Sequence, residues 1–383
     1  MRLLTASFLT LLLTLPARAA TPAETAKATI EKSLDYLVKD QQPSGSFQRS
    51  DREPPAVTAL VLRAIVQSPK YGPASEPAKK AVAYLLTQQQ PNGGIYKDML
   101  ATYNTAISLS ALAAVNDPAL KPNIEKAVTY LKGAQTGAIA GAGGAKIDPN
   151  DPKFGGWNYG GARGGLEDVS NTAIALEALK DAGLKPEDPA YQNALKFVTR
   201  LQNNSETNPS AKWVGDDGGF IYNPGKAGEG GSAAGEYTTP DGKRLLRSYG
   251  SMTYAGLKSL VYAGVSKDDP RVKAAWKWVG ENFTVDVHPG LAANGPESAR
   301  DGIYYYYVAY AKALAAYGEP KITDKAGKVH DWREALIAKL ASVQNADGSF
   351  TGTQKWMENS PTIATSFAVL ALQDAERDLA ARK

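Results

Sequence analysis

The residues best suited to chemistry lie at the start of a helix-forming stretch, GGLEDVSNTAIALEAL, residues 164–179. Asp168 is followed by Ser170 and Asn171, and then by small residues that favour a helix. A carboxyl group at this place could donate a proton to a substrate. It could equally cap the helix, because Asp and Asn are good N-cap residues. Glu167 lies about 100° from Asp168 around a helix and cannot substitute for it.

Aromatic residues form a second group of candidates, in and just after three long segments at about residues 133–166, 203–246 and 281–300. Long loops on a rigid scaffold often carry binding sites. The residues expected to bind substrate are Trp157, Tyr159, Tyr222, Tyr249, Tyr254, Tyr304, Tyr305, Tyr306 and Tyr307, with the carboxylates Asp216, Asp217 and Asp301. The last part of the chain adds Trp356 and Glu358. Successive residues of a helix point in different directions, so the run of four tyrosines cannot all face one cavity.

Some kinds of chemistry are excluded by composition. The chain has no cysteine and two histidines, His288 and His330. This excludes disulfides, cysteine nucleophiles and thiolate zinc sites. A histidine-rich metal site and a Ser-His-Asp triad are not expected either. We therefore predict no metal and no cofactor.

The elements that must position these residues repeat along the chain. LDYLVKDQQPSGSF (34–47), VAYLLTQQQPNGGI (82–95) and IAKLASVQNADGSF (337–350) each read as a helical segment that reaches a Gln. After three intervening residues comes Gly-x-apolar. Weaker copies begin at residues 128, 195 and 274.

A second helical segment follows each copy. These segments are rich in Ala and nearly free of charge, and they align on one position, occupied by Thr58, Thr105, Thr172, Thr253, Tyr307 and Thr365. In three of them a glycine typical of a helix C-terminus follows 11 residues later. The pattern predicts six two-helix units and twelve helices, with no strand of any length.

The two kinds of helix differ in how they should be buried. The first kind carries Lys and Glu on one face, whereas a helix that is apolar on most sides is a buried one. We expect an all-α, six-hairpin α/α toroid with six inner and six outer helices. The first and last units resemble the middle ones, which favours a closed ring over an open solenoid with polar ends. The long segments join outer to inner helices in units three, four and five, so they should crowd one rim.

The bulk numbers fit an exported globular protein. Of 383 residues, 43% are hydrophobic and 21% charged, and the net charge of +4 is too small to hold nucleic acid. Residues 1–19 have the form of a secretory signal peptide: Arg2, an apolar run and Ala17-Arg18-Ala19. Residues 20–383 then form one domain, periplasmic or secreted and without a transmembrane segment. No pattern predicts an oligomeric state.

The Q-x3-G-x-aromatic ending resembles the QW repeats of squalene/hopene cyclases. The paired helices resemble the α/α toroid shared with protein prenyltransferase β subunits, over about residues 24–376. The resemblance implies a terpene cyclase/mutase-like protein, of the isomerase or lyase class if it is an enzyme, with an isoprenoid lipid as ligand. The zinc ligands of the prenyltransferases, Asp, Cys and His, have no counterpart set in this chain.

DVSNTA resembles the D-x-D-D-T-A motif of the cyclases, whose middle Asp protonates an alkene. Asp168 matches the first acid, Ser170 stands at the proton-donor position, and Asn171 stands at the next. A serine hydroxyl cannot protonate an alkene. If the chain is catalytic, Asp168, Ser170 and Asn171 are the residues that the resemblance assigns to the chemistry.

Three functions remain open. The first is a terpenoid-cyclase-like protein that binds or converts a polyprenyl or triterpenoid lipid, which requires a deep apolar cavity. The second is a polysaccharide-active enzyme or glycan binder, which requires an open site with facing carboxylates, such as Asp216 or Asp217 with Asp301 or Glu236. The third is a non-catalytic envelope scaffold, whose centre would be filled by side chains.

Overall fold

The computed structural model describes residues 19–50, 53–137, 147–161, 165–226 and 228–382. All but the last residue of the predicted signal peptide therefore lies outside the described residues. The described part is mostly helical, with twelve α-helices, four short 3-10 helices and four strands of three residues each. The all-α class predicted from the sequence is confirmed, and two short hairpins that the sequence did not predict are added to it.

The helices alternate along the chain between two positions. The odd-numbered helices, which the sequence predicts to be outer, are α1 (Pro22–Lys39), α3 (Glu76–Thr87), α5 (Lys121–Ala134), α7 (Pro189–Thr199), α9 (Pro270–Glu281) and α11 (Trp332–Val343). The even-numbered helices are α2 (Ala56–Val66), α4 (Ala101–Val115), α6 (Val169–Asp181), α8 (Gly250–Tyr262), α10 (Ile303–Tyr317) and α12 (Pro361–Ala381). The 3-10 helices are η1 (Pro118–Leu120), η2 (Leu291–Asn294), η3 (Pro296–Arg300) and η4 (Lys355–Met357).

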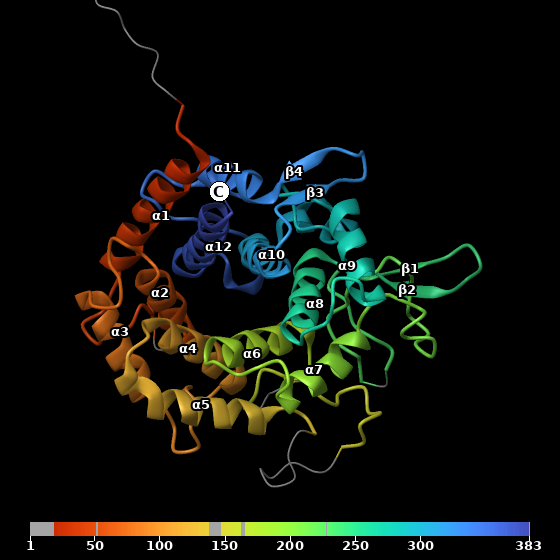
Figure 1. Ribbon diagram of the computed structural model, residues 1–383, viewed down its shortest axis with the longest axis horizontal. Coiled ribbons are helices and arrows are strands. Elements are labelled where there is room, and N and C mark those ends of the chain that lie inside the picture. Colours follow the sequence, from red (N-terminus) through yellow and green to blue (C-terminus); the bar gives the residue numbers. More distant parts are fainter. Residues whose placement is uncertain (1–18, 51–52, 138–146, 162–164, 227, 383) are drawn as a thin grey trace, which may run out of the picture.

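The even-numbered helices contact one another in chain order, and α12 returns to contact α2. Figure 1 shows them around the centre, with the odd-numbered helices outside. Burial follows this arrangement. Helix α1 buries one stripe that includes Ile30, Leu34 and Leu37, whereas α8 is buried at every position from Gly250 to Leu260. A stripe is what a helix with one covered face needs, and burial on all sides is what a central helix needs.

One hydrogen-bond pattern joins consecutive outer helices. The side-chain amide of Gln89 donates to the carbonyl oxygens of Gly93 and Asn123, each at 3.0 Å. It thereby fastens its own turn to the first turn of α5. Four other glutamines bridge in the same way, in the sets Gln41–Gly45–Pro77, Gln135–Gly155–Ala190, Gln202–Gly218–Arg271 and Gln344–Gly348–Thr29. The last set links α11 to α1 and closes the ring.

A second contact ties each of these turns to its inner helix. The backbone N–H of the apolar residue after Gly-x donates to the hydroxyl of the aligned threonine. The pairs are Phe47–Thr58, Ile95–Thr105, Trp157–Thr172, Phe220–Thr253 and Phe350–Thr365, at 2.8–3.1 Å. The five apolar side chains are fully buried. The repeated residues therefore fix the inner helix against the outer one.

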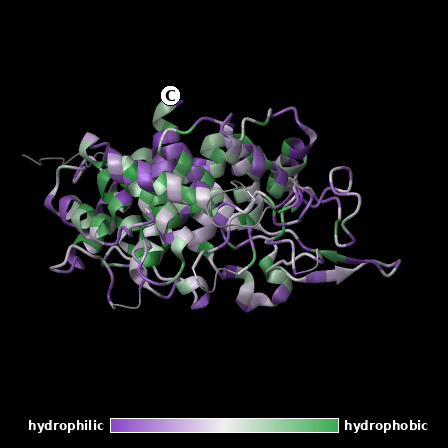
Figure 2. Cartoon of the chain, turned by 90° about the horizontal axis from the view of Figure 1, so that it is seen from below, coloured by the Kyte–Doolittle hydropathy of each residue, from purple (hydrophilic) through white to green (hydrophobic). Residues whose placement is uncertain are grey.

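The two rims of the ring differ. Strands β1 (Glu236–Thr238) and β2 (Arg244–Leu246) pair antiparallel within the long α7–α8 connection. Figure 2 shows this hairpin extending sideways from the edge of the molecule, at the level away from the C-terminal end of α12. The long connections lead to the N-termini of α6, α8 and α10 on that face. None of the helices in the described ranges combines the length and the apolar run needed to cross a membrane.

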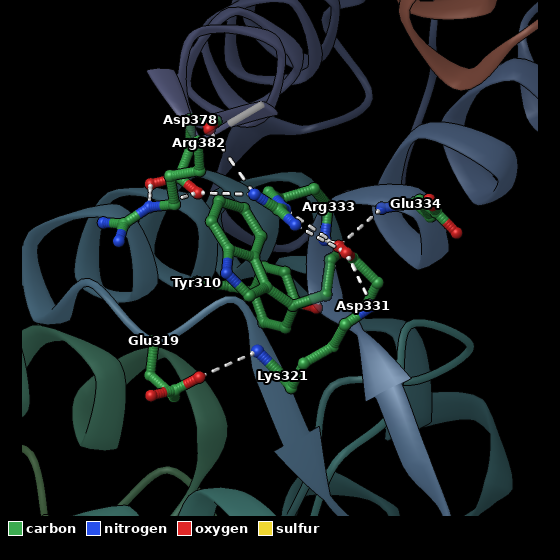
Figure 3. Close-up of polar contacts among 9 residues, drawn as sticks. Tyr310, Glu319, Lys321, Asp331, Arg333, Glu334, Asp378 and Arg382 are labelled. Carbon is green, nitrogen blue, oxygen red and sulfur yellow. Dashed lines mark hydrogen bonds and ion pairs between the residues drawn. The ribbon is translucent and has the colours of Figure 1, made fainter. Parts of the chain in front are cut away.

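The other hairpin, β3 (Lys321–Thr323) with β4 (Val329–Asp331), leads into α11. Figure 3 shows the buried Arg333 guanidinium between Asp331, which caps α11, and Asp378 near the end of α12. Arg382 binds the same Asp378 carboxylate at 3.0 Å. A buried guanidinium with two carboxylate partners keeps its charge satisfied and holds the end of α12 on α11.

The turn glycines give a direct test of the joints between units. Gly155 has φ +88°, and a Cβ there would lie 2.0 Å from the Asn193 carbonyl oxygen; Gly183 has φ +92° with nothing within 4 Å. Gly183→Ala should cost about 1 kcal/mol, the ordinary penalty of a left-handed non-glycine residue. Gly155→Ala should cost about 3 kcal/mol or more because α7 must also shift. Urea unfolding midpoints measure both, and equal midpoints would contradict the joint.

Candidate functional site

A cavity of about 410 Å³ lies at the centre of the ring, on the side of the long connections. Its wall is apolar and aromatic, with hydroxyl groups. The lining residues are Pro54, Ala56, Val57, Leu60, Leu100, Tyr103, Tyr159, Ser170, Tyr222, Ala233, Tyr249, Ser251, Met252, Tyr305, Trp356, Met357, Ile363 and Phe367. None of these described lining residues is Asp, Glu, Lys, Arg or His.

The repeat register explains which inner-helix residues reach this cavity. In every unit the residue two positions before the aligned Thr or Tyr lines it, giving the set Ala56, Tyr103, Ser170, Ser251, Tyr305 and Ile363. The six helices thus present equivalent positions at one height. Long connections supply Tyr159, Tyr222 and Tyr249 above this ring. Ser170 Oγ lies 2.5 Å from Tyr305 Oη, so a pair of hydrogen-bonded hydroxyl groups from α6 and α10 forms part of the wall.

Asp168 sits behind this wall and caps α6. Its Oδ1 accepts the backbone N–H of Asn171 and its Oδ2 accepts the Asn171 side-chain amide, both at 2.7 Å. Tyr222, which lines the cavity, is a further hydrogen-bond partner. Burial raises the pKa of Asp168 to about 7 against the effect of these hydrogen bonds. The geometry of a cap is therefore present, and Tyr222 connects the carboxyl group to the cavity.

Tyr159 and Tyr222 remain neutral donors beside this carboxyl group. Burial and the nearby Asp168 raise the pKa values of both phenols, and the two hydroxyls are hydrogen-bonded to each other. The hydroxyl groups of Tyr159 and Tyr222, which can both donate and accept hydrogen bonds, thus lie between Asp168 and the cavity. The same wall offers aromatic faces, which attract positive charge.

Five of the aromatic residues predicted to bind substrate do not line the cavity. Trp157 is fully buried and donates its indole N–H to the Leu131 carbonyl at 2.7 Å. Tyr306 and Tyr307 donate their hydroxyls to the carbonyls of Thr284 and Val285. Tyr254 and Tyr304 are buried and pack edge-on against other aromatic rings. Asn171 is buried behind the wall with Asp168.

Each of the predicted carboxylates is bound to a nearby residue. Asp216 accepts the backbone N–H of Ser205, and Asp217 accepts the hydroxyl of Ser248, each at 2.8 Å. Asp301 accepts the Thr353 hydroxyl at 2.9 Å, and Glu236 pairs with Arg244 on the β1–β2 hairpin. Each carboxylate therefore has a local structural partner, and none belongs to the lining of the cavity.

Strained backbone is concentrated on the cavity rim. Leu100, Trp356 and Met357 have φ values of 55°, 53° and 62°, and they are three of the four non-glycine residues with positive φ in the described ranges. All three line the cavity. Strain of this kind persists where surrounding structure enforces it, often at ligand sites. No sequence pattern indicated Leu100 or Met357, because the positions of these two residues depend on the paths of loops.

Glu358, next to this segment, caps α10. Its Oε1 accepts the backbone N–H of Tyr305 at 2.7 Å, and the backbone N–H groups of Tyr304 and Ile303 are further partners of this carboxyl group. Burial raises the pKa of Glu358 to about 7, with Asp301 adding to the effect. Asp168, which caps α6, and Glu358, which caps α10 from the connection before α12, are thus two buried carboxyl groups at the N-termini of inner helices, where the helix dipole favours negative charge.

We compared the chain with known proteins by sequence and by structure. No family model matches the chain. Drimenyl diphosphate synthase of Streptantibioticus cattleyicolor is 26% identical over 206 residues, which cover 53% of this chain and 34% of that protein. The match therefore spans about a third of the relative's length.

Two solved structures have similar folds. The type II terpene cyclase MstE from Scytonema, in complex with its product merosterolic acid A, superposes with a TM-score of 0.54 and 12% identity over 93% of this chain and 99% of that one. An α-amylase from Clostridium perfringens superposes with a TM-score of 0.53 and 14% identity, covering 91% and 98%. The predicted resemblance to terpene cyclases is confirmed at the level of the fold.

The two raised carboxyl pKa values predict a pH dependence of stability. A carboxyl whose pKa is higher in the folded state stabilises the fold below its unfolded pKa of about 4, and this contribution is lost as pH rises through about 7. Each group contributes on the order of 3–4 kcal/mol across that window. The melting temperature should therefore fall between pH 5.5 and pH 8.

Single substitutions separate the contributions. Asp168→Asn keeps an N-cap residue and should flatten this fall, and Glu358→Gln should do the same. Asp216→Asn is the matched control, because the pKa of Asp216 is lowered and its carboxylate stays ionised throughout the window. Melting curves at closely spaced pH values measure the slope. An unchanged slope in Asp168→Asn would show that Asp168 does not titrate there.

Proposed function

We propose that this protein is an exported, terpenoid-cyclase-like α/α toroid, with six inner and six outer helices, that binds or converts a polyprenyl or triterpenoid-type lipid in its central cavity. The observation that carries the proposal is the uncharged, aromatic lining of that cavity. Export rests on the sequence of residues 1–19. Ser170 stands where the related cyclases hold their protonating Asp.

The lining suits a branched hydrocarbon. Apolar groups gain about 0.8 kcal/mol for each methylene moved from water into such an environment. The aromatic side chains Tyr103, Tyr305 and Phe367 give the wall polarisable faces, which suit double bonds and any cationic character that develops on them. A type II terpene cyclase structure in complex with geranylgeranyl dihydroxybenzoate has a similar fold, with a TM-score of 0.53.

The arrangement limits the chemistry that could start on such a ligand. The described O–H groups that line the cavity belong to tyrosines and serines, which are too weakly acidic to protonate an alkene. Asp168 is close to half-protonated near neutral pH and reaches the cavity through Tyr222. In this proposal Asp168 acts through that hydroxyl on an oxygen-bearing end of the ligand, and the other lining residues hold and orient the chain.

A glycan-active enzyme is the alternative that the α-amylase structure raises. Glycoside hydrolysis ordinarily needs two carboxyl groups that flank the scissile bond. Among the described residues, the predicted candidates Asp217 and Asp301 are bound to Ser248 and Thr353, away from the cavity lining. A scaffold without ligand is disfavoured by the open volume itself. A binding protein without catalysis remains compatible with the same cavity.

The proposal is tested by mass spectrometry of the molecules that stay with the mature protein through gentle purification, in both organic and aqueous extracts. An isoprenoid near one molecule per chain is the expected result. An oligosaccharide would favour the glycan alternative and refute the lipid proposal. Retention of no small molecule, together with no binding of added prenyl alcohols, would leave the scaffold function.

A blocking substitution tests whether the ligand lies in the cavity. Ser251 lines the cavity on α8, is 1% exposed, and has no side-chain hydrogen bond among those found in the described structure. Ser251→Trp should fill much of the space and reduce ligand retention at least about tenfold. Ser266→Trp adds the same side chain to an exposed turn after α8 and should retain the ligand. Equal retention by both variants would place the ligand elsewhere.

A further inference from the structure

A second cavity, of about 700 Å³, lies at the end of the ring opposite the long connections. It is formed by the C-terminal turns of α6, α8, α10 and α12, together with the turn that joins α6 to α7. Helix α12 ends on the same side of the molecule (Figure 2). Lys180 and Lys185 line this cavity and are exposed, so it opens to solvent. We call it the far cavity.

The repeat register leads from the main cavity to the far cavity. Residues two positions after the aligned Thr or Tyr line a chamber of about 50 Å³ below the main cavity. Residues five positions after it end that chamber, and they are Arg63, Ser110, Glu177, Lys258, Lys312 and Leu370. Residues eight or nine positions after it line the far cavity, and they are Lys180, Asp181, Val261, Tyr262, Ala315, Ala316 and Asp374. The far cavity is thus the last level of the same repeat.

A buried ionic cluster separates the chamber from the far cavity. Glu177 lies 2.7 Å from Arg63 and 2.6 Å from Lys258, and it also binds Lys312. Arg63 and Lys312 line both spaces. These charges are desolvated and depend on one another, so moving them apart would leave a buried charge unpaired. A ligand of the main cavity therefore does not extend into the far cavity.

The far cavity carries a surplus of positive charge. The three cations of the cluster are balanced by three acids, because Asp181 pairs with Arg63 and Asp374 lies 3.8 Å from Lys312. Beyond these, the described lining adds three more cations and no acid, namely Lys180, Lys185 and Arg377. Within the described ranges, no ion pair involves either lysine. Two ammonium groups at the edge of the cavity thus have no carboxylate to neutralise them.

These lysines are not needed to cap the inner helices. A cation near a helix C-terminus often binds the last carbonyl groups. Here the backbone N–H groups of Gly183 and Leu184 donate to carbonyls in the last turn of α6, at 2.9 and 3.0 Å. Helix α8 ends with the same pair of bonds, at 3.0 and 3.1 Å. The ammonium groups of Lys180 and Lys185 therefore remain available to a ligand.

Two other donors in the lining lack a hydrogen-bond partner within the described part of the chain. The Tyr262 hydroxyl makes no hydrogen bond there, and Lys180 Nζ lies 5.0 Å from the centre of the Tyr262 ring. Arg63 Nε is buried and also has no acceptor. A buried donor without an acceptor is unfavourable unless a ligand or water satisfies it. The far cavity therefore combines positive charge with unused donors.

We propose that the far cavity is a second ligand site, separate from the central cavity, and that it binds the phosphate group of a small molecule. Lys180 comes from α6, Lys185 from the turn after it, and Tyr262 from α8, which contacts α6. A phosphate offers acceptor oxygens on several sides and can be bound by donors from all three.

The lining also distinguishes between classes of anion. A planar carboxylate is best matched by a guanidinium group. Arg377 is the guanidinium at the edge of the cavity, and it is already bound to Asp374 and Gln67. Phosphate is therefore the better match. Leu184, Val261 and Ala315 give the lining apolar surface, which suits an organic group attached to the phosphate.

Isothermal titration calorimetry of the full mature chain, at low ionic strength and pH 8, tests the site with inorganic phosphate and phenyl phosphate. Both should bind. Tighter binding of phenyl phosphate would identify an organic phosphate as the ligand, since apolar surface is then buried too. Equal affinities would identify free phosphate. The double variant Lys180→Gln and Lys185→Gln should weaken both affinities at least about tenfold.

A second variant tests the hydroxyl group. Tyr262→Phe removes a hydroxyl that has no described protein partner, so the melting temperature of the ligand-free protein should stay unchanged. The affinity for phosphate should fall by about threefold or more, because one donor to the ligand is lost. A residue with a purely structural role would show the reverse pattern.

A matched control separates a site from general attraction to a positive surface. The double variant Lys126→Gln and Lys196→Gln removes two exposed lysines from α5 and α7 that do not line the far cavity. It should bind both probes with wild-type affinity. An equal loss in this control would overturn the proposal. Absence of binding by the wild-type protein would overturn it too, as would wild-type affinity in both the Lys180–Lys185 double variant and Tyr262→Phe.

Discussion

The glutamine amide at the end of an outer helix is the interaction on which the rest of the structure depends. Gln89, for example, donates one hydrogen bond to its own turn and another to the start of the next outer helix. Gly93 must lack a side chain because a Cβ there would lie 2.5 Å from the Lys126 carbonyl. At five of the six joints a glutamine thus positions one outer helix against the next, and the Gln344 side chain makes the joint between α11 and α1. The joint after α9 has no such glutamine, and there Gly280 instead approaches the Thr323 carbonyl of β3.

Because these joints repeat, the inner helices present their side chains at matching heights. Residues four and then three positions apart on a helix lie on one face, so each inner helix gives one residue to the cavity wall, one to the chamber below and one to the ionic level. The N-termini of the same helices gather at the rim and need acceptors for their free N–H groups. Different units supply different caps: Asn104 for α2, Asp168 for α6, His288 for α8 and Glu358 for α10. Hydrogen-bond acceptors therefore lie beside the cavity because the helix N-termini need them, whether or not the site is catalytic.

This logic shows what the sequence could and could not predict. The repeats predicted the helices, their alternation and the long connections on one rim, because period and turn residues are local properties. The same register would have selected Tyr305 from the run 304–307 and would have added Tyr103, since both stand two positions before the aligned residue. It would also have removed Trp157, which occupies the buried position after Gly-x that Phe47 and Phe350 hold in other units. The positions of Tyr222, Leu100 and Met357 depend on the paths of loops, which no local pattern encodes.

A terpene cyclase and an α-amylase share this fold, so the ring of helices does not by itself determine which reaction a protein catalyses. The choice is made by the residue types at each height. In this chain no described charged residue lines the main cavity. The charged residues Arg63, Glu177, Lys258 and Lys312 lie further along the inner helices, where they form ion pairs with one another. The upper wall offers a sugar hydroxyl groups but no described carboxylate, whereas glycoside hydrolysis ordinarily needs two carboxyl groups. An isoprenoid needs apolar surface along its length and a few hydroxyls at one end, and the wall near Ser170 and Tyr222 offers this order. The separation of apolar and ionic residues along the inner helices is therefore the property that most restricts the class of ligand.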